Sequence, residues 1–161
     1  MYILHQPIIT VHKFSEDFCE ENYVLIALHC GLEDYALAYV LNMALKINLK
    51  RSKTDLDISN KTSFPIYEWK DKLNERNWTL IVNTSVKEEY LEVHDLFSNE
   101  TSSTAYHVLP EYKDVDYLLK IEQEEDEVDS GMLDSILEIP KIITAYQIET
   151  DRLKSKQNLI I

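Results

Sequence analysis

Hydrophobic positions in the first third of the chain predict one strand followed by one helix. Residues 23–29 read YVLIALH, an apolar segment without helical phase, which predicts a strand buried on both faces. Apolar residues then recur at helical spacing, with a second apolar stripe beside the first, and predict a helix over 32–46. Glu33 and Asp34 at its start and Lys46 at its end suit the helix dipole. Because its polar surface is narrow, we expect this helix to be largely buried.

The middle of the chain favours strands. Alternating Leu56 and Ile58 predict an edge strand, and the segments 64–69 and 78–82, on either side of the polar stretch KDKLNERN, predict a β-hairpin. Residues 85–103 are ambiguous: KEEYLEVHDLF fits one or two amphipathic helical turns, and we expect NETSST after it to be loop.

The last third predicts two strands around a short helix. Residues 115–121 alternate between apolar and mostly polar positions, which predicts a half-buried strand. A helix over 131–139, capped by Asp129 or Ser130, and a strand over 142–148 follow. We therefore predict an α+β fold in which a mostly antiparallel sheet of about five to seven strands carries two helices. No linker marks a boundary, so we expect a single globular domain over 1–161, with a loosely ordered N-terminal extension over 1–20.

Composition and charge exclude several classes of function. The chain has 161 residues, 45% of them hydrophobic, and its 16 basic against 29 acidic residues give a net charge of −13. This charge repels polyphosphates and anionic lipids, so we expect neither a nucleic-acid nor a membrane partner. The two glycines, Gly31 and Gly131, are too far apart to form a glycine-rich phosphate loop, and we expect no cofactor.

Neither the cysteines nor the acidic run predict a metal site. Cys19 and Cys30 lack CxxC spacing and fit a reducing cytosol, and no signal peptide or membrane span is predicted, so we expect a cytoplasmic protein. The segment 122–129 contains six acidic residues without the glycine and ligand order of a calcium-binding EF-hand loop. We interpret it as a solvated loop and expect no bound metal.

One nine-residue segment resembles a known family. Residues 109–117 read LPEYKDVDY, which is similar to the signature of the bacterial IPExxxVDY proteins. Five positions match it letter for letter, and Leu109 replaces its isoleucine: Pro110, Glu111, Val115, Asp116 and Tyr117. Further similarity in LEDY, WTLI and LKSKQNLI extends the resemblance over about 22–161. It implies a bacterial protein and brings no assigned biochemical activity with it.

The motif itself is explained better as a structural corner than as a binding site. Pro110 restrains Leu109 to an extended conformation and predicts a sharp corner between a strand that ends near 108 and one that begins near 115, whose Val115 and Tyr117 share one face. Its carboxylates, Glu111 and Asp116, would accept hydrogen bonds from loop amides or pair with a cation such as Arg51 or Lys113. The alternative is a ligand site.

Two functions from different classes remain open. The first is a non-catalytic interaction or regulatory module that contacts a protein partner or self-associates. The second is a small-molecule binder or an enzyme with a site at the end of the first strand, where open sheets place ligands. Its candidate residues are His29, Glu33, Asp34, Glu111 and Asp116, and Pro110 and Tyr117 complete the set of ligand or partner candidates.

No residue is assigned a catalytic role. The thiol of Cys30 lies just before a helix N-terminus, but neighbouring strand residues point to opposite faces, so His29 is badly placed to activate it. We therefore favour the non-catalytic function. A pocket of a few hundred Å³ (roughly the volume of small-ligand sites) with convergent polar groups would favour the alternative.

Overall fold

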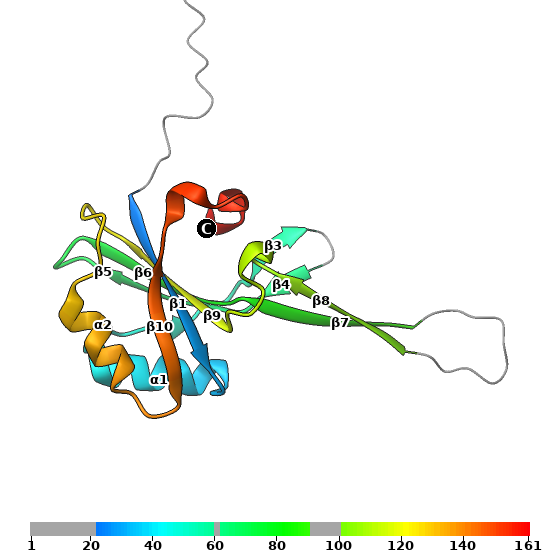
Figure 1. Cartoon of the computed structure of the whole chain (residues 1–161), viewed down its shortest axis with the longest axis horizontal. Helices are drawn as coiled ribbons and strands as arrows, with labels where there is room; N and C mark the ends of the chain where they lie inside the picture. The colour runs from blue at the N-terminus through cyan, green and yellow to red at the C-terminus, as the bar shows by residue number, and fades with distance from the viewer. Residues whose placement is uncertain (1–21, 60–61, 91–100) are drawn as a thin grey trace, which may run out of the picture.

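The computed structural model describes residues 22–59, 62–90 and 101–161 (Figure 1). Its strands and helices follow one another in this order: β1 (Tyr23–Cys30), α1 (Asp34–Leu45), β2 (Lys50–Arg51), β3 (Leu56–Ser59), β4 (Thr62–Phe64), β5 (Ile66–Asp71), β6 (Arg76–Val82), β7 (Thr84–Tyr90), β8 (Thr101–His107), β9 (Tyr117–Glu122), α2 (Ser130–Leu137) and β10 (Ile142–Ile148). Short 3₁₀ helices span Pro110–Tyr112, Thr150–Arg152 and Lys156–Leu159.

Six strands form one antiparallel sheet in the order β10-β1-β9-β6-β5-β2. The predicted α+β fold is confirmed, as are the first strand, the 142–148 strand and the β5–β6 hairpin. The strand with Leu56 and Ile58 is β3, which pairs with β4 in a separate two-stranded sheet. The edge strands of the main sheet are instead β10 and β2.

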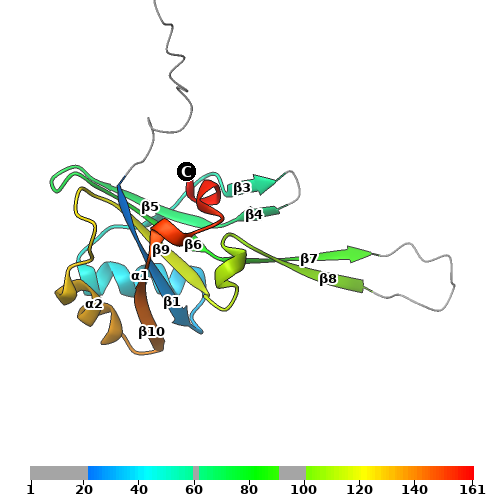
Figure 2. The ribbon, with the colours of Figure 1, turned by 45° about the horizontal axis from the view of Figure 1, so that its top comes forward.

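Both helices lie on one face of the sheet (Figures 1 and 2). Leu37 and Leu41 of α1 and Ile136 of α2 pack on alternate residues of β1, among them Ile26 and Leu28. The helix α2 begins where a cap was predicted, because the side chain of Asp129 accepts a hydrogen bond from the Gly131 N–H at 3.1 Å.

The other face is covered by segments without long helices. Phe64 from β4, Val108 and Leu109 from the predicted corner, and Leu153 and Leu159 from the C-terminal segment form a second cluster on this face. β9 contributes to both clusters and is buried on both faces from Tyr117 to Ile121, so the prediction of a half-buried strand is wrong.

A buried lysine explains why β9 was misread from the sequence. Lys120 is 2% exposed, and its ammonium donates to Glu122 at 2.8 Å and to the Leu159 carbonyl at 3.0 Å. It also lies over the ring of Tyr23, 5.1 Å from the centroid. These partners compensate the cost of burying the charge, so the polar residue Lys120 occupies a buried position in β9.

Three further expectations from the sequence are corrected. The helix α1 is buried on one face only, because Tyr35, Tyr39 and Met43 are 64% to 68% exposed. Val115 and Tyr117 belong to different clusters on opposite faces, since β9 begins at Tyr117 and Val115 still lies in the corner.

The third correction concerns 85–103, where strands replace the first part of the expected helical turns and the last part of the expected loop. β7 and β8 pair over seven residues each, from Thr84 opposite His107 to Tyr90 opposite Thr101. This hairpin, called the arm below, projects away from the sheet in both views (Figures 1 and 2). The remainder of that prediction, and the predicted N-terminal extension, lie outside the described residues.

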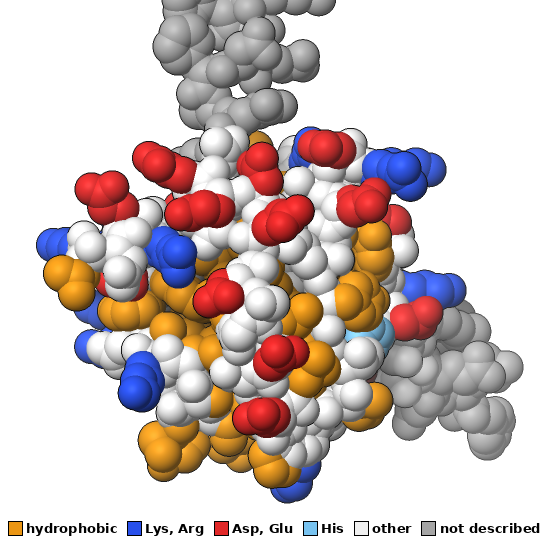
Figure 3. Space-filling model, turned by 60° about the vertical axis from the view of Figure 1, so that its left-hand side comes forward, with side chains coloured by type: hydrophobic (Ala, Val, Ile, Leu, Met, Phe, Trp, Pro, Cys, Tyr) orange, Lys and Arg blue, Asp and Glu red, His pale blue; other side chains and the backbone are white. Residues whose placement is uncertain are grey.

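Acidic side chains are spread over the face drawn in Figure 3, with exposed hydrophobic patches between them. The predicted loop after β9 contributes several of the exposed acids, namely Glu124, Glu125, Asp126 and Glu127. The backbone of this loop is held by amide side chains: Gln123 donates to the Glu125 and Glu127 carbonyls, and Gln147 donates to that of Asp126.

Candidate functional site

The segment 108–117, which contains the LPEYKDVDY motif, is a tight corner between the arm and β9. Leu109 and Val115 are 0% and 2% exposed and anchor it in the second cluster. Pro110 begins the 3₁₀ helix Pro110–Tyr112, where its fixed φ suits the first helical position and its missing N–H costs no hydrogen bond. The predicted proline corner therefore forms as a structural unit.

Asn83 holds this corner from inside. Its side chain is 0% exposed, accepts a hydrogen bond from the Leu109 N–H at 3.0 Å, and donates to the carbonyls of Tyr112 and Val115 at 2.9 and 2.8 Å. Its backbone carbonyl also accepts from the Val108 N–H at 2.9 Å. The sequence analysis missed this residue, although an asparagine directly after the mostly apolar run WTLIV is a signal that could have found it.

Asp116 and Tyr117 connect the corner to the loop after β1. The Asp116 carboxylate accepts a hydrogen bond from the Cys30 N–H at 3.0 Å, and the Tyr117 hydroxyl donates to the Leu32 carbonyl at 2.5 Å. Burial raises the pKa of Tyr117, and the neighbouring Cys30, Asp34, Glu33 and Asp116 raise it further. Tyr117 therefore remains a neutral hydrogen-bond donor at physiological pH.

Glu111 connects the corner to the C-terminal segment. Its carboxylate accepts from the Ser155 N–H at 3.1 Å and from the Ser155 hydroxyl at 3.0 Å. Nearby, the Asn158 side chain donates to the Val108 carbonyl at 2.9 Å. Burial raises the pKa of Glu111, but hydrogen bonds from its own backbone and from Ser155 and Lys154 outweigh burial and hold this pKa below its ordinary value.

His29 contacts Tyr146 and lies close to Asp116, because its chain neighbours Leu28 and Cys30 both form hydrogen bonds with Asp116. Its Nε2 is 3.1 Å from the Tyr146 hydroxyl, and the two rings stack with centroids 5.6 Å apart. Burial raises the pKa of Tyr146, with smaller contributions from Tyr112 and Asp114. Glu33 and Asp34 lie instead at the start of α1, where the Asp34 carboxylate accepts from the Tyr35 N–H at 2.8 Å.

The structure brings Glu33, Asp34, Asp116 and Tyr117 close together at the end of β1, where the three carboxylates all raise the pKa of Tyr117, while Glu111 lies against the C-terminal segment. Asp116 and Tyr117 contact the loop after β1, Glu111 contacts Ser155, and His29 contacts Tyr146.

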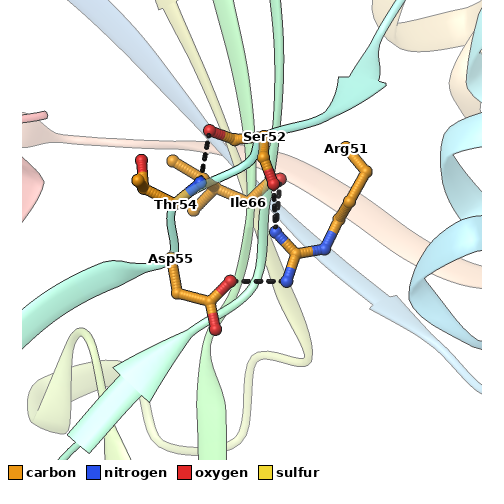
Figure 4. Close-up of polar contacts among 5 residues, drawn as sticks. All are labelled: Arg51, Ser52, Thr54, Asp55 and Ile66. Carbon is orange, nitrogen blue, oxygen red and sulfur yellow. Dashed lines mark hydrogen bonds and ion pairs between the residues drawn. The ribbon is translucent and has the colours of Figure 1, made fainter.

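The cation suggested for the motif carboxylates is occupied elsewhere. Figure 4 shows that the Arg51 guanidinium donates to Asp55 at 2.5 Å and to the Ser52 and Ile66 carbonyls. Arg51 therefore holds the turn between β2 and β3, and the suggested pairing of Arg51 with Glu111 or Asp116 is wrong.

The Cys30 thiol has the environment of a structural cysteine. Cys30 is 5% exposed in the cluster beneath the helices. Burial raises its pKa, a backbone hydrogen bond from Leu32 lowers it, and Asp116 raises it again, so the net shift is upward. The raised pKa disfavours the thiolate that nucleophilic catalysis requires.

A cavity of about 320 Å³ lies at the other end of the strands from His29. It is lined by both tryptophans, Trp69 and Trp78, and by Arg76 and Lys46 among others. Trp78 pairs with Ile121, which in turn faces Val24 near the start of β1. The Trp78 Nε1 is buried without a hydrogen-bond partner. The sequence analysis did not single out either tryptophan.

The described residues contain neither a metal-binding cluster nor a membrane-spanning helix. Across 22–59, 62–90 and 101–161, no group of three or more His, Cys, Asp or Glu side chains is arranged to hold a metal ion. None of the helices in these residues is long and apolar enough to cross a membrane. No family model, no curated protein and no solved structure matches the chain.

Proposed function

We propose that the chain, as an IPExxxVDY-like protein, is a non-catalytic interaction or regulatory module of the bacterial cytosol that docks on a protein partner through its arm. The projecting β7–β8 hairpin is the observation that carries this proposal (Figure 1). The contacts of the motif carboxylates support a non-catalytic role as well, because Asp116 and Glu111 accept hydrogen bonds from backbone groups of the chain itself.

The arm is fixed at its base and open along its length. At the base, Thr84 Oγ1 lies 3.1 Å from His107 Nδ1, and β4 contacts β7. Farther out, Val86 is 63% exposed opposite Ala105. Within the described residues, β7 and β8 form a sheet of their own with two strands.

Such a hairpin gains stability from a third strand. Two strands without a hydrophobic face are marginal in water, and each outer edge presents unpaired backbone groups. The sequence of β8, TSSTAYH, contains no Asp, Glu, Lys or Arg that would repel another strand. An extended segment of a partner protein that adds to this edge is the binding mode that the arm favours.

Site-specific photo-crosslinking tests the arm directly. A photoreactive residue at Val86 is compared with one at Leu73, which is 92% exposed in the turn between β5 and β6. In cells of the source organism we expect one discrete adduct with another polypeptide from position 86 and none from position 73. The same adducts from both positions, or none from position 86, would contradict docking through the arm.

Small-molecule binding is a second candidate, favoured by the cavity rather than by the end of β1. Trp69 and Trp78 are 6.5 Å apart between ring centroids and supply aromatic walls, and the lining carries both signs of charge: basic Lys46 and Arg76, and acidic Asp71 and Asp129. We propose small aromatic molecules that carry both an amine and a carboxylate as the ligands to test. Since the chain has 2 tryptophans and both line the cavity, intrinsic fluorescence titration reports on binding there. A saturable change that Arg76→Ala abolishes would support this candidate, and unchanged fluorescence would contradict it.

A further inference from the structure

The outer face of α1 carries a continuous apolar stripe. Tyr35, Tyr39 and Met43 are 68%, 64% and 68% exposed and follow one another at a spacing of four residues, so they lie along one side of the helix. From Tyr35 to Leu45 the helix contains no charged residue. Single exposed hydrophobic residues are ordinary in proteins, but an aligned set on an uncharged helix is the pattern of a buried surface.

The opposite side of the same helix already packs on the sheet. Leu37 and Leu41 are 0% exposed there, and Ala38 is 3% exposed. The helix is therefore apolar on two faces, while the fold covers one of them. We propose that a second copy of this chain covers the other face, with the two α1 helices antiparallel about a two-fold axis.

The order of the stripe fits a copy of itself. Tyr35 and Met43 are equally distant in sequence from Tyr39. In an antiparallel pair centred on Tyr39, the two Tyr39 rings meet and each Tyr35 meets Met43 of the second copy. Tyrosine pairs and sulfur–aromatic contacts are both favourable. A two-fold interface requires this self-complementarity, because the same patch forms both sides.

The charges at the ends of α1 select the antiparallel arrangement. Glu33 and Asp34 stand before the stripe and Lys46 stands after it. Antiparallel packing brings the acidic end of each helix to the basic end of the other, whereas parallel packing would bring like charges together. The helix dipoles favour the same arrangement.

The net charge of −13 on each copy opposes this association at long range. Salt screens such repulsion over about 10 Å at 0.1 M ionic strength, so we expect the dimer to become stronger between low and moderate salt. This dependence distinguishes an apolar contact between two acidic molecules from one that is held mainly by ion pairs.

Sedimentation velocity over about 5 to 200 µM, the range in which small interfaces dissociate, tests the dimer. We expect a monomer–dimer equilibrium that Tyr39→Ser weakens at least tenfold, as a central interface side chain would. Leu73→Ser removes a side chain that is 92% exposed in the turn between β5 and β6 and does not belong to the stripe, so it should leave the equilibrium unchanged. A monomer at every concentration, or a dimer that Tyr39→Ser does not weaken, would overturn the proposal.

Charge reversal tests the orientation of the two helices. The Glu33 side chain forms no capping hydrogen bond that Glu33→Lys would remove. Lys46 has a positive φ of 55°, which glutamate adopts at no greater cost than lysine, so Glu33→Lys and Lys46→Glu should both fold. Each single change should weaken the antiparallel dimer, and the double change should restore it. If the double variant stays as weak as the single variants, the antiparallel arrangement is wrong. Val86→Asp should leave the dimer intact, so failure of the arm and failure of this interface are distinguishable.

Discussion

The polar residues of the corner act mainly on the protein's own backbone. Asn83 satisfies backbone groups of three residues, Asp116 accepts from Cys30, and Glu111 accepts from Ser155. A side-chain acceptor for an amide that no strand or helix satisfies removes the cost of leaving that amide unpaired. The motif residues Glu111 and Asp116 are thus explained by the backbone amides of Ser155 and Cys30 that they bind.

Replacement of Asn83 should be the most damaging single change at the corner. Asn83→Ala leaves the Leu109 N–H and the Val115 carbonyl without their side-chain partner in a buried region, while the Tyr112 carbonyl keeps the Val115 N–H, and the change should lower the free energy of unfolding by about 3 kcal/mol. Urea unfolding measures this loss. The matched control is Asn77→Ala, which removes one exposed hydrogen bond to Glu122. Equal losses for the two variants would contradict the role given to Asn83.

The Glu111 contact should depend on pH. Its folded-state pKa lies below the ordinary value of 4.5, because hydrogen bonds from Ser155 and its neighbours outweigh the effect of burial. The contact therefore adds stability above the ordinary pKa and loses it as the pH falls through the lowered, folded-state pKa.

Unfolding measured between about pH 7 and pH 3 for the wild type and Glu111→Gln should show a difference that is largest near neutral pH and vanishes in acid. A difference that does not change with pH would mean that the carboxylate charge is not involved.

The corner could be predicted from residues 109–117 alone, but its contacts could not. Proline before a strand indicates a sharp turn, and this follows from local geometry. The partners of Asp116 and Glu111 stand 86 and 44 positions away in the sequence, and only the strand order brings them close. Arg51 is a different case, because its partner Asp55 stands only four positions along the chain, and the sequence analysis overlooked this local contact.

At the scale of elements, the arm and β9 were hard to predict for opposite reasons. None of the described side chains of the arm is buried, so β7 and β8 lack the apolar alternation that marks a half-buried strand. β9 has a polar residue at a fully buried position, so its alternation predicted a solvated face that does not exist. In both cases the pattern reports the environment of the side chains, which the surrounding structure decides.

The arm should be the least protected pair of strands in the free protein. Amides toward its outer end, from Lys87 to Tyr90 and from Thr101 to Thr104, should exchange with solvent much faster than those of β1 and β9, because the arm has no second layer to stabilise it. Hydrogen exchange followed by mass spectrometry measures this difference. Comparable protection in the arm and in β1 would show that the arm is stable without a partner.

The loop after β9 should tolerate loss of its acidic charges but not loss of the Gln123 side chain that binds its backbone. Changing Glu124, Glu125, Asp126 and Glu127 together to Gln or Asn should leave stability unchanged or raise it by a few tenths of a kcal/mol, roughly what relief of repulsion between exposed charges gives. Gln123→Ala should instead lower it by about 1 to 2 kcal/mol, because Gln123 is 8% exposed and donates to two loop carbonyls. Thermal unfolding compares the two, and a large loss in the neutralised variant would contradict the interpretation as a solvated loop.

The whole molecule combines a well-packed sheet with surfaces that the fold leaves uncovered. Each face of the sheet has its own buried cluster, and these clusters explain why hydrophobic periodicity alone was sufficient to predict the α+β class. The sequence could not show that the apolar stripe of α1 stays exposed, since periodicity reports that a residue is apolar and not which surface covers it. The arm and the stripe are the features of the described surface that most favour contact with other polypeptides.

The most direct test of the account is partner recovery by purified, folded variants whose stability is measured on the same sample. Val86→Asp should abolish recovery of the polypeptide crosslinked from position 86 while the melting temperature stays at the wild-type value. Asp116→Asn should lower the free energy of unfolding by about 1 kcal/mol, as weakening one charged hydrogen bond does, and should still recover that partner below its melting temperature. If Asp116→Asn instead keeps full stability and partner recovery but abolishes turnover of a metabolite, the motif is catalytic and the account is contradicted.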